Sequence, residues 1–202
     1  VEFGEIEKFI QTVEAYIFDY EWKEYNLLVL PPSFPFGGME NPCLTFVTPT
    51  IIHGDRSLAI VVAHEISHSW SGNLVTMNQW SDFWLNEGFT MFIQRKITEI
   101  LYGKDRKLVS AQGGVKILEQ DVETLGETNE FTKLVPNLIG RNPEEDFSNV
   151  PYEKGFNFVY YLEQLINSYG EGKDIFKVIL QEYFTAYKFQ SINTLDFLFM
   201  FT

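Results

Sequence analysis

Apolar residues recur at every third or fourth position over several long stretches of this chain, which is the spacing of an amphipathic helix. The stretches with this spacing are residues 5–20, 58–71, 83–102, 105–125, 156–168, 174–188 and 193–202. Each is expected to bury its apolar face against a common core. The pattern therefore predicts a mainly helical protein.

Two shorter apolar runs lack this spacing and predict strands. Asn26–Leu30, which is ended by two prolines, is expected to be a buried strand, and Cys43–Val47 is expected to be a further strand. Residues 127–146 contain Asn, Pro and Gly at short intervals and are expected to form a long irregular connection. The predicted fold class is thus α+β, dominated by helices.

The composition is that of a folded domain. The 202 residues are 45% hydrophobic and 16% aromatic, which is enough for one sizeable core. The chain opens at Val1 without a methionine and stops at Phe201 and Thr202, within a stretch of helical spacing. We therefore expect residues 1–202 to be part of one domain of a longer protein.

The charge of the chain argues against nucleic acid as a partner. Lys and Arg number 15 against 28 Asp and Glu, which gives a net charge of −13, and no basic cluster offsets it. No apolar run is long enough to span a bilayer. Cys43 is the only cysteine, so no internal disulfide can form. A cytoplasmic location is expected, and secretion is left open.

The strongest chemical signal is the run His64-Glu65-Ile66-Ser67-His68. On a helix its two histidines lie one turn apart on the same face, so both imidazoles can bind one metal ion. Residues Asp55 to Ser57 precede this helix and are expected to cap it. The alternative is a pair of ordinary half-buried histidines beside a solvated glutamate.

A third metal ligand must come from elsewhere in the chain. Catalytic zinc commonly has three protein ligands, and the chain contains only 3 histidines. Glu87 is the predicted third ligand because it lies at the start of the next helix, close enough for the two helices to pack together. His53 is a weaker candidate, since a histidine in a loop that contains Gly is usually a polar surface group.

Residues beside the predicted ligands have supporting roles. Glu65 is turned about 100° around the helix from His64, so it points beside the metal and can accept a proton from bound water. Asp82 either caps the next helix or accepts a hydrogen bond from a metal-binding imidazole. Gln94, two turns beyond Glu87, is a second candidate for that hydrogen bond.

Gly37 and Gly38 precede the second strand, and Glu40 follows them closely. A pair of glycines allows another backbone to approach, and peptides often bind enzymes by pairing with such an edge. Taken alone, the pair is more often a simple turn, and Glu40 a surface charge.

Several motifs together resemble one known family, the gluzincin zinc aminopeptidases. The motifs that carry the resemblance are Gly37–Asn41, His64–His68 and Asn86–Gly88. Within the family, longer stretches are similar to the branch that contains aminopeptidase B and leukotriene A4 hydrolase: Pro35–Pro49, His64–Val75 and Pro151–Phe156. The resemblance extends from about Tyr25 to the end of the chain.

Four positions help to choose within this branch. Phe36 stands where the leukotriene hydrolase has tyrosine and Gln94 where it has glutamate, and both look like aminopeptidase B. Phe147 replaces a tyrosine that lines the epoxide pocket of the hydrolase. Glu144 replaces an aspartate associated with epoxide hydrolysis and with recognition of a basic side chain. The resemblance therefore favours a preference for Arg or Lys over epoxide hydrolysis.

The resemblance implies a thermolysin-like catalytic domain that is incomplete here, without the family's amino-terminal β-domain and carboxy-terminal helical domain. It implies one Zn²⁺ per chain, bound by His64, His68 and Glu87, and peptide substrates with a free amino terminus. Glu65 is implied to be the general base. Tyr152 is implied to donate its hydroxyl to the oxyanion of the tetrahedral intermediate.

The same resemblance implies a set of substrate-binding residues. Glu40 would bind the α-ammonium group, the backbone of Gly37 and Gly38 with the neighbouring Met39 would hold the peptide, and Glu144 would meet a basic side chain. Two alternatives stay open: an epoxide hydrolase of the leukotriene A4 type that uses the same zinc, and a zinc-binding interaction protein without catalytic activity.

Overall fold

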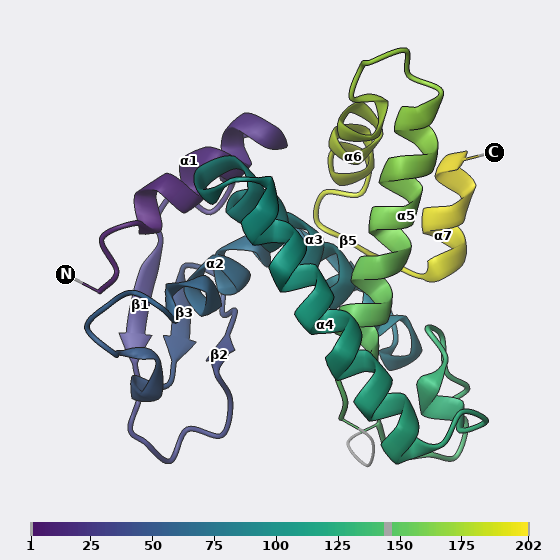
Figure 1. Ribbon diagram of the computed structural model, residues 1–202, viewed down its shortest axis with the longest axis horizontal. Helices are drawn as coiled ribbons and strands as arrows, with labels where there is room; N and C mark the ends of the chain where they lie inside the picture. The colour runs from purple at the N-terminus through teal and green to yellow at the C-terminus, as the bar shows by residue number, and fades with distance from the viewer. Residues whose placement is uncertain (1, 144–146, 202) are drawn as a thin grey trace.

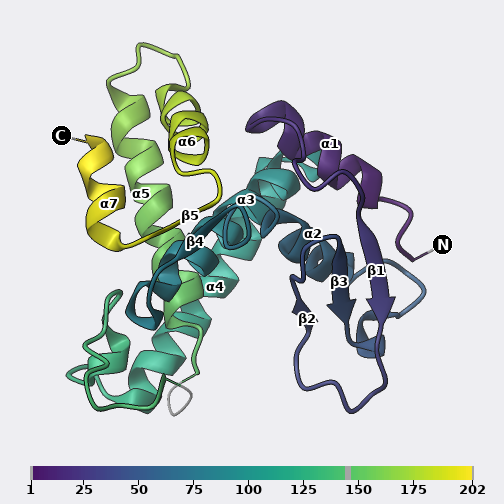
Figure 2. The same cartoon turned by 180° about the vertical axis from the view of Figure 1, so that it is seen from behind.

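Helix α3, Phe83–Tyr102, runs through the middle of the molecule, and the other elements pack around it (Figures 1 and 2). The structure is a computed structural model that describes residues 2–143 and 147–201. Helices α1 and α2 and a small sheet lie on one side of α3, and α5, α6 and α7 lie on the other (Figure 1). The predicted α+β class, mainly helical, is confirmed.

All predicted helical stretches contain a helix, but most of these helices are shorter than predicted. Their bounds are α1 Ile6–Tyr16, α2 Ala59–Ser67, α3 Phe83–Tyr102, α4 Lys104–Leu125, α5 Gly155–Ser168, α6 Ile175–Ala186 and α7 Thr194–Leu198. The last stretch forms only the short α7 and a 3-10 turn over Phe199–Phe201. In the described part of the chain, no helix has both the length and the apolar character needed to cross a bilayer.

The start of α2 differs from the prediction. Its N-cap residue is Leu58, which makes no side-chain cap, and the Asp55 carboxylate instead accepts a hydrogen bond from the Ser57 backbone amide at 2.9 Å. The predicted cap is therefore wrong, because Asp55 closes a local turn three residues before the N-cap position. α2 also ends at Ser67, and Gly72 turns the chain with a positive φ of 110°.

Two small sheets accompany the helices. In the first, β1 Asn26–Val29 runs parallel to β3 Leu44–Val47, and β2 Gly38–Met39 pairs antiparallel with the other side of β3. The second joins β4 Val75–Met77 to β5 Gln190–Ile192 in parallel. β2, β4 and β5 were not predicted, since two or three residues are too few to show a strand period.

Strand β1 was predicted to be buried, and this is wrong. Leu28 is 42% exposed and Val29 is 40% exposed. β1 lies at the edge of its sheet and pairs only with β3 among the described residues. An apolar run is therefore evidence for a strand, but it does not show that both faces of the strand are covered.

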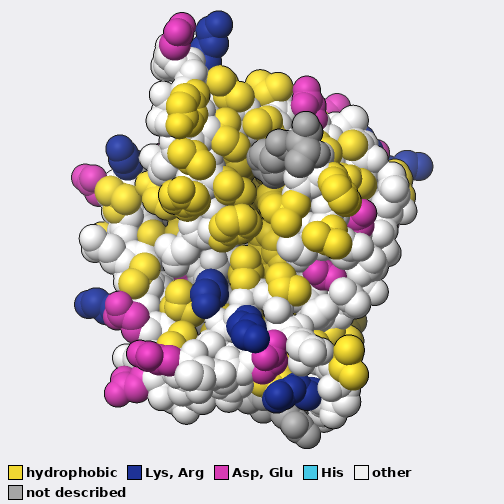
Figure 3. Space-filling model, turned by 90° about the vertical axis from the view of Figure 1, so that its right-hand side faces the viewer, with side chains coloured by type: hydrophobic (Ala, Val, Ile, Leu, Met, Phe, Trp, Pro, Cys, Tyr) yellow, Lys and Arg dark blue, Asp and Glu magenta, His cyan; other side chains and the backbone are white. Residues whose placement is uncertain are grey.

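Aromatic rings fill the core where α3 meets α6 and α7. The rings of Phe89, Tyr183 and Phe197 lie with their centroids 5.1, 5.3 and 5.5 Å apart. Aromatic residues from late in the chain thus contribute to the core. Tyr161 and Phe199 are exposed exceptions, and hydrophobic side chains gather on the face of the molecule that carries α5 and α7 (Figure 3).

Helix α4 buries its predicted apolar face only in part: Leu108, Leu118 and Val122 are half-buried. Val115 and Ile117, expected to face the core, are exposed, whereas Lys107 and Gly114 are the buried positions. The reason lies on α3, which presents charged side chains to this helix: Lys107 Nζ donates to Glu99 Oε2 at 2.7 Å. The apolar pattern predicted the helix correctly but not which of its positions are fully buried.

The close crossing of α3 and α5 depends on two glycines. A Cβ atom added at Gly88 would lie 2.7 Å from the Cα atom of Gly155, and one added at Gly155 would lie 2.8 Å from the Cα atom of Gly88. Backbone atoms occupy the space that any side chain would need. Since Gly88 directly follows Glu87, this crossing also fixes the depth at which Glu87 lies.

We expect Gly88→Ala to destabilise the full-length protein by about 1–3 kcal/mol, because the new methyl group overlaps backbone that cannot move without shifting a helix. Thermal denaturation measures this effect. Gly113→Ala is the matched control: it also lies within a helix, but a Cβ there meets nothing within 4 Å. The control should be neutral or stabilising. Equal destabilisation by both changes would contradict the packing argument.

Candidate metal centre and active site

A cavity of about 900 Å³ opens between the small sheet, α2 and α3. His64, Glu65 and His68 reach it from α2 and the residue that follows it, and Glu87 reaches it from the second turn of α3. The sequence-predicted ligands therefore meet in one place. Apolar side chains form much of the remaining wall, among them Phe36, Trp80, Phe83, Phe131, Leu134 and Phe147.

Three donor atoms form a nearly equilateral triangle at the base of this cavity. His64 Nε2 lies 3.2 Å from His68 Nε2, and Glu87 Oε2 lies 3.3 Å from each of the two. Ligands that bind zinc tetrahedrally at about 2.0–2.1 Å lie roughly 3.3 Å apart. Two imidazole nitrogens, one carboxylate oxygen and this spacing together fit a zinc ion.

The electrostatics of this triangle favour a cation. Glu87 Oε2 is buried and has no hydrogen-bond donor, which is costly for a carboxylate without a positive partner. Burial alone would lower the pKa of His68, but the carboxylates of Glu87 and Glu40 outweigh it and raise the pKa to about 10. Burial opposes ionisation of Glu87, yet the imidazoles of His68 and His64 lower its pKa to about 2.

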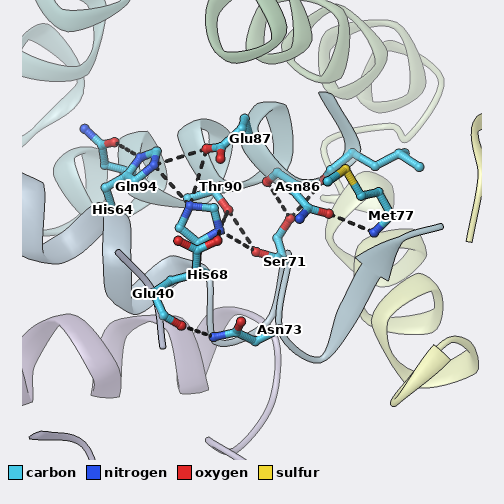
Figure 4. A network of polar contacts seen from close by, with 11 residues as sticks. Glu40, His64, His68, Ser71, Asn73, Met77, Asn86, Glu87, Thr90 and Gln94 are labelled. Atoms are coloured by element: carbon cyan, nitrogen blue, oxygen red, sulfur yellow. Dashed lines mark hydrogen bonds and ion pairs between the residues drawn. The ribbon is translucent and has the colours of Figure 1, made fainter. Parts of the chain in front are cut away.

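Each imidazole is oriented by a hydrogen bond from its other nitrogen. Nδ1 of His64 lies 2.9 Å from Gln94 Oε1, and Nδ1 of His68 lies 2.9 Å from the carbonyl oxygen of Ser71. Carbonyl oxygens only accept, so both Nδ1 atoms carry the proton and both Nε2 lone pairs face the centre. The prediction for Gln94 is confirmed (Figure 4).

Asp82 does neither of the two things predicted for it. It stands at the N-cap of α3 without a side-chain cap, and its Oδ1 accepts hydrogen bonds from the backbone amide and hydroxyl of Thr194, at 3.0 and 2.5 Å. The carboxylate therefore ties the start of α3 to the distant α7. No local sequence pattern indicates this partner, because the two residues are 112 positions apart in the chain.

Sequence reasoning missed the hydrogen bonds that Ser71 and Thr90 make between α2 and α3. The hydroxyl of Ser71 donates to the carbonyl oxygens of Leu85 and Asn86, at 3.0 and 2.9 Å. Thr90 Oγ1 donates to the Ser71 carbonyl and lies 3.1 Å from His68 Nδ1. These bonds hold the His68 turn against the first turns of α3 (Figure 4). Thr90 lies three residues after Glu87, one helical turn away, and that spacing is the signal that could have found it.

Glu65 lies beside the triangle rather than within it, as predicted. It is buried, and burial raises its pKa to about 7, although the neighbouring histidines lower it. A carboxyl with such a pKa exchanges protons near neutral pH. Gly38 makes room for it, since a Cβ there would overlap the Glu65 carboxylate.

Glu40 lies on the sheet side of the cavity. Its Oε1 is 3.8 Å from His68 Nδ1, and its backbone carbonyl accepts a hydrogen bond from Asn73 Nδ2 at 2.7 Å (Figure 4). Gly38 and Met39 form β2, an edge strand that lines the cavity, while the Gly37 carbonyl is used within the sheet by Thr48 at 3.1 Å. This arrangement leaves one side of β2 facing the cavity.

Tyr152 reaches the cavity from the opposite wall. It belongs to a π-helical turn, Val150–Lys154, that precedes α5. Its ring stacks on His64 with centroids 6.1 Å apart and meets Phe83 and Phe147 edge to face. Burial and then the charges of the nearby carboxylates raise the pKa of Tyr152, so the hydroxyl keeps its proton and can donate it in a hydrogen bond.

The other sequence candidates are not part of this cluster. Glu144 lies outside the described residues. His53 is exposed in the loop before α2, which agrees with its interpretation as a surface group. Cys43 is half-buried with a free thiol.

Comparison with known proteins identifies the family. The model of the peptidase family M1 domain matches residues 3–202, which is nearly the whole chain. The chain belongs to peptidase family M1. The resemblance to zinc aminopeptidases is thereby confirmed at the level of the family.

Relatives of this M1 chain carry two kinds of name. The leukotriene A-4 hydrolase of Xenopus laevis is 53% identical over 96% of the chain, and the leucine aminopeptidase 2 of Sclerotinia sclerotiorum is 51% identical over 95%. The chain spans 31% of the length of each of these relatives. Neither is named aminopeptidase B, so a closer likeness to aminopeptidase B stays a prediction.

Solved structures agree with the M1 fold. Leukotriene A4 hydrolase from Saccharomyces cerevisiae superposes with a TM-score of 0.91 at 42% identity, over 98% of this chain and 31% of that one. An M1 zinc metallopeptidase from Deinococcus radiodurans superposes with a TM-score of 0.74 at 21% identity, over 98% of this chain and 39% of that one. The second comparison supports the fold alone.

We expect Gln94→Leu in the full-length M1 protein to lower zinc affinity about tenfold to a hundredfold, because His64 loses the only side chain that fixes its Nδ1 proton among the described residues. Competition with a chelator measures this affinity. Thr90→Val is the matched control, since His68 keeps the Ser71 carbonyl, and it should bind zinc nearly as well as the wild type. A larger loss with Thr90→Val would contradict these assignments.

Proposed function

We propose that the full-length protein is a zinc-dependent aminopeptidase that hydrolyses the bond after the first residue of a peptide. One observation carries the proposal: two further carboxylates lie beside the triangle of His64, His68 and Glu87. They are Glu65, which can accept a proton, and Glu40, which lies near the His68 imidazole. The relatives named for aminopeptidase activity support it.

Zinc would be held by the two Nε2 atoms and by Glu87, one ion per chain. Bound there, it would polarise the scissile carbonyl group and lower the pKa of a water molecule. The oriented imidazoles and the buried carboxylate fix this binding place before any substrate arrives.

Glu65 is proposed to be the general base. It would take the proton from the attacking water and later return it to the leaving amine. Its burial and its pKa of about 7 suit a group that must both accept and release a proton. Because Gly38 leaves space for this carboxylate, the wall around Glu65 adjoins the strand proposed to bind the peptide.

Tyr152 is proposed to stabilise the oxyanion of the tetrahedral intermediate by donating its hydroxyl hydrogen. A donor that is already in place when negative charge develops contributes a large part of catalysis in such sites. Its stacking on His64 keeps the ring at the wall of the cavity, across from Glu40.

Glu40 is proposed to bind the α-ammonium group of the substrate, which would restrict cleavage to the first residue. The free side of β2 would pair with the peptide backbone through Gly37, Gly38 and Met39. The negative charge of Glu40, close to the metal-binding imidazoles, suits a cationic terminus better than an acylated one.

The choice of first residue is proposed to include Arg and Lys, through Glu144. The described wall of the cavity is largely apolar and contains Lys133, which favours an apolar first residue instead. Reporter amides of arginine, leucine and alanine, offered to the full-length protein with and without a chelator, distinguish the two preferences. Release from none of the three amides would overturn the proposed activity.

An epoxide hydrolase of the leukotriene A4 type is the second candidate. The names of two relatives and the apolar wall of the cavity favour it, while Phe147 removes the tyrosine hydroxyl that the resemblance associates with the epoxide pocket. Turnover of the lipid epoxide by the full-length protein would reveal it. A zinc protein that turns over neither substrate class would instead be an interaction protein.

The chain is further proposed to be part of one thermolysin-like catalytic domain. Its relatives are about three times longer, which supports additional domains of the same protein as its neighbours. Limited proteolysis of the full-length protein, followed by mass measurement, would locate the domain boundaries.

We expect Glu65→Gln to lower kcat by about 10²–10⁴-fold with zinc still bound, because the amide keeps the shape of the side chain but cannot accept the proton. Zinc content and steady-state kinetics of the full-length protein are the measurements. A variant that retains near-normal kcat would remove Glu65 from the proposed role.

We expect Glu40→Gln to lower kcat/KM for free-amine peptides about tenfold to a hundredfold, because an ammonium group loses a charged partner. A peptide analogue that lacks the α-amino group provides the control. The wild type should prefer the free amine strongly, and the variant should lose most of that preference. If the preference stays unchanged, Glu40 does not bind the terminus.

A further inference from the structure

The π-helical turn that carries Tyr152 is held from outside the cavity. Glu153, the next residue, points away from the metal centre and meets Arg95 of α3. Arg95 Nη1 donates to Glu153 Oε2 at 2.8 Å, and Nη2 donates to Oε1 at 2.9 Å. Arg95 is 2% exposed and Glu153 is 4% exposed. The pair is thus bidentate and buried, a geometry that fixes two elements rigidly.

Arg95 gathers further elements around this contact. Its Nε donates to Ser110 Oγ and its Nη2 to the Ser110 carbonyl, both at 3.1 Å, which ties in α4. Its guanidinium lies 4.1 Å above the ring of Phe156 in α5. One side chain therefore connects α3, α4, α5 and the turn that bears Tyr152.

The surrounding backbone is shaped to admit the pair. A Cβ at Gly114 of α4 would overlap the Glu153 carboxylate and would lie 2.7 Å from Arg95 Nη2. This explains why α4 buries Gly114 while exposing Val115. A glycine whose side-chain space is taken by an ion pair indicates that the position of Glu153 is tightly specified.

A buried ion pair is a weak source of net stability, because its charges are expensive to remove from water. The same pair can nevertheless fix the positions of the two elements that it joins. π-helical turns are rare and are frequent at functional sites. Other hydrogen bonds to this turn each join a single donor to a single acceptor. Among them, the Glu153 amide donates to the Asn149 carbonyl at 2.8 Å, Asn157 Nδ2 donates to the Glu153 carbonyl at 2.7 Å, and Lys154 Nζ donates to the Thr132 carbonyl at 2.6 Å.

We propose that Arg95 and Glu153 are positioning residues for catalysis: their bidentate pair holds the Tyr152 hydroxyl where the oxyanion develops. This inference rests on the proposed aminopeptidase function. Arg95 follows Gln94 directly on α3, so the helix that orients His64 through one residue also places Tyr152 through the next. The distance between the metal centre and the hydroxyl is thereby set by one rigid element.

The test uses the full-length, zinc-loaded protein with Arg95→Met and Glu153→Gln. Because an oxyanion donor is worth about 10²–10³ in kcat, we expect each variant to lower kcat about tenfold to a hundredfold with KM changed less than about threefold. Zinc content should stay unchanged. If Arg95→Met does not fold, Glu153→Gln, which keeps the side-chain shape, carries the test alone. A normal kcat in a folded variant would overturn the proposal.

The decisive comparison is made in a Tyr152→Phe background. If the pair acts through the Tyr152 hydroxyl, adding Glu153→Gln to Tyr152→Phe should lower kcat less than about twofold further. Losses that multiply in full would show that the pair does not act through Tyr152, and would overturn the proposal. A general loosening of the fold would also multiply, so this readout separates position from stability.

Binding gives a second readout that is independent of turnover. A phosphinic dipeptide analogue presents a tetrahedral centre with an oxygen in place of the oxyanion, whereas the free amino acid product does not. Glu153→Gln should weaken the phosphinic analogue about tenfold or more and leave product affinity unchanged. Equal loss for both ligands would contradict a role at the oxyanion.

Glu163→Gln is the matched control. Glu163 of α5 is buried and forms another ion pair with α3, through the half-buried Lys96 Nζ at 2.5 Å, but it does not belong to the Tyr152 turn. It should leave kcat and the affinity for the phosphinic analogue near the wild-type values.

Failure of the proposed function would appear differently from failure of this inference. If the proposed function is wrong, the wild-type protein releases no first residue from any peptide. If only this inference is wrong, the wild type remains active.

Discussion

The burial of one carboxylate between two imidazoles is the constraint on which this structure depends. Glu87 Oε2 is removed from water, has no hydrogen-bond donor and lies 3.3 Å from two nitrogen lone pairs. Three such atoms held this close repel one another unless a proton or a metal ion lies among them. The fold must therefore supply enough packing energy to hold the ligands together, and the cation completes the balance.

Helix α3 holds most of the groups of the site in place. It contributes the ligand Glu87, then Gln94 two turns later to orient an imidazole, and then Arg95 to grip the turn of Tyr152. The Gly88 and Gly155 contact sets how closely α5 approaches it. A single rigid helix thus positions a metal ligand, the hydrogen-bond partner of an imidazole and the opposite wall of the cavity. Such an arrangement can hold the distances between these groups to within a few tenths of an ångström.

Sequence reasoning found the features that have a short-range signature. The histidines one turn apart, the glutamate at the start of the next helix and Gln94 two turns beyond it follow from helical periodicity alone. Tyr152 entered only through resemblance to a family, since its approach to His64 joins elements that no local pattern relates. Asp82 was misjudged for the same reason, because its partner Thr194 belongs to the last helix.

Two further misjudgements concern which face of an element is covered. The apolar positions of α4 suggested a buried hydrophobic stripe, but α3 offers this helix charged groups, so Lys107 and Gly114 turn inward. β1 was expected to be buried because its residues are apolar. Periodicity reports the existence of an element reliably, whereas the identity of its neighbour decides which side meets water.

The exposed edge of β1 has a practical consequence for handling this polypeptide. A strand with one unpaired edge and apolar residues such as Leu28 and Val29 in water is a template for pairing with other chains. The face over α5 and α7 adds Tyr161, Leu195 and Phe199 to the apolar area in contact with solvent. Exposed apolar surfaces of this kind favour contact with other protein segments.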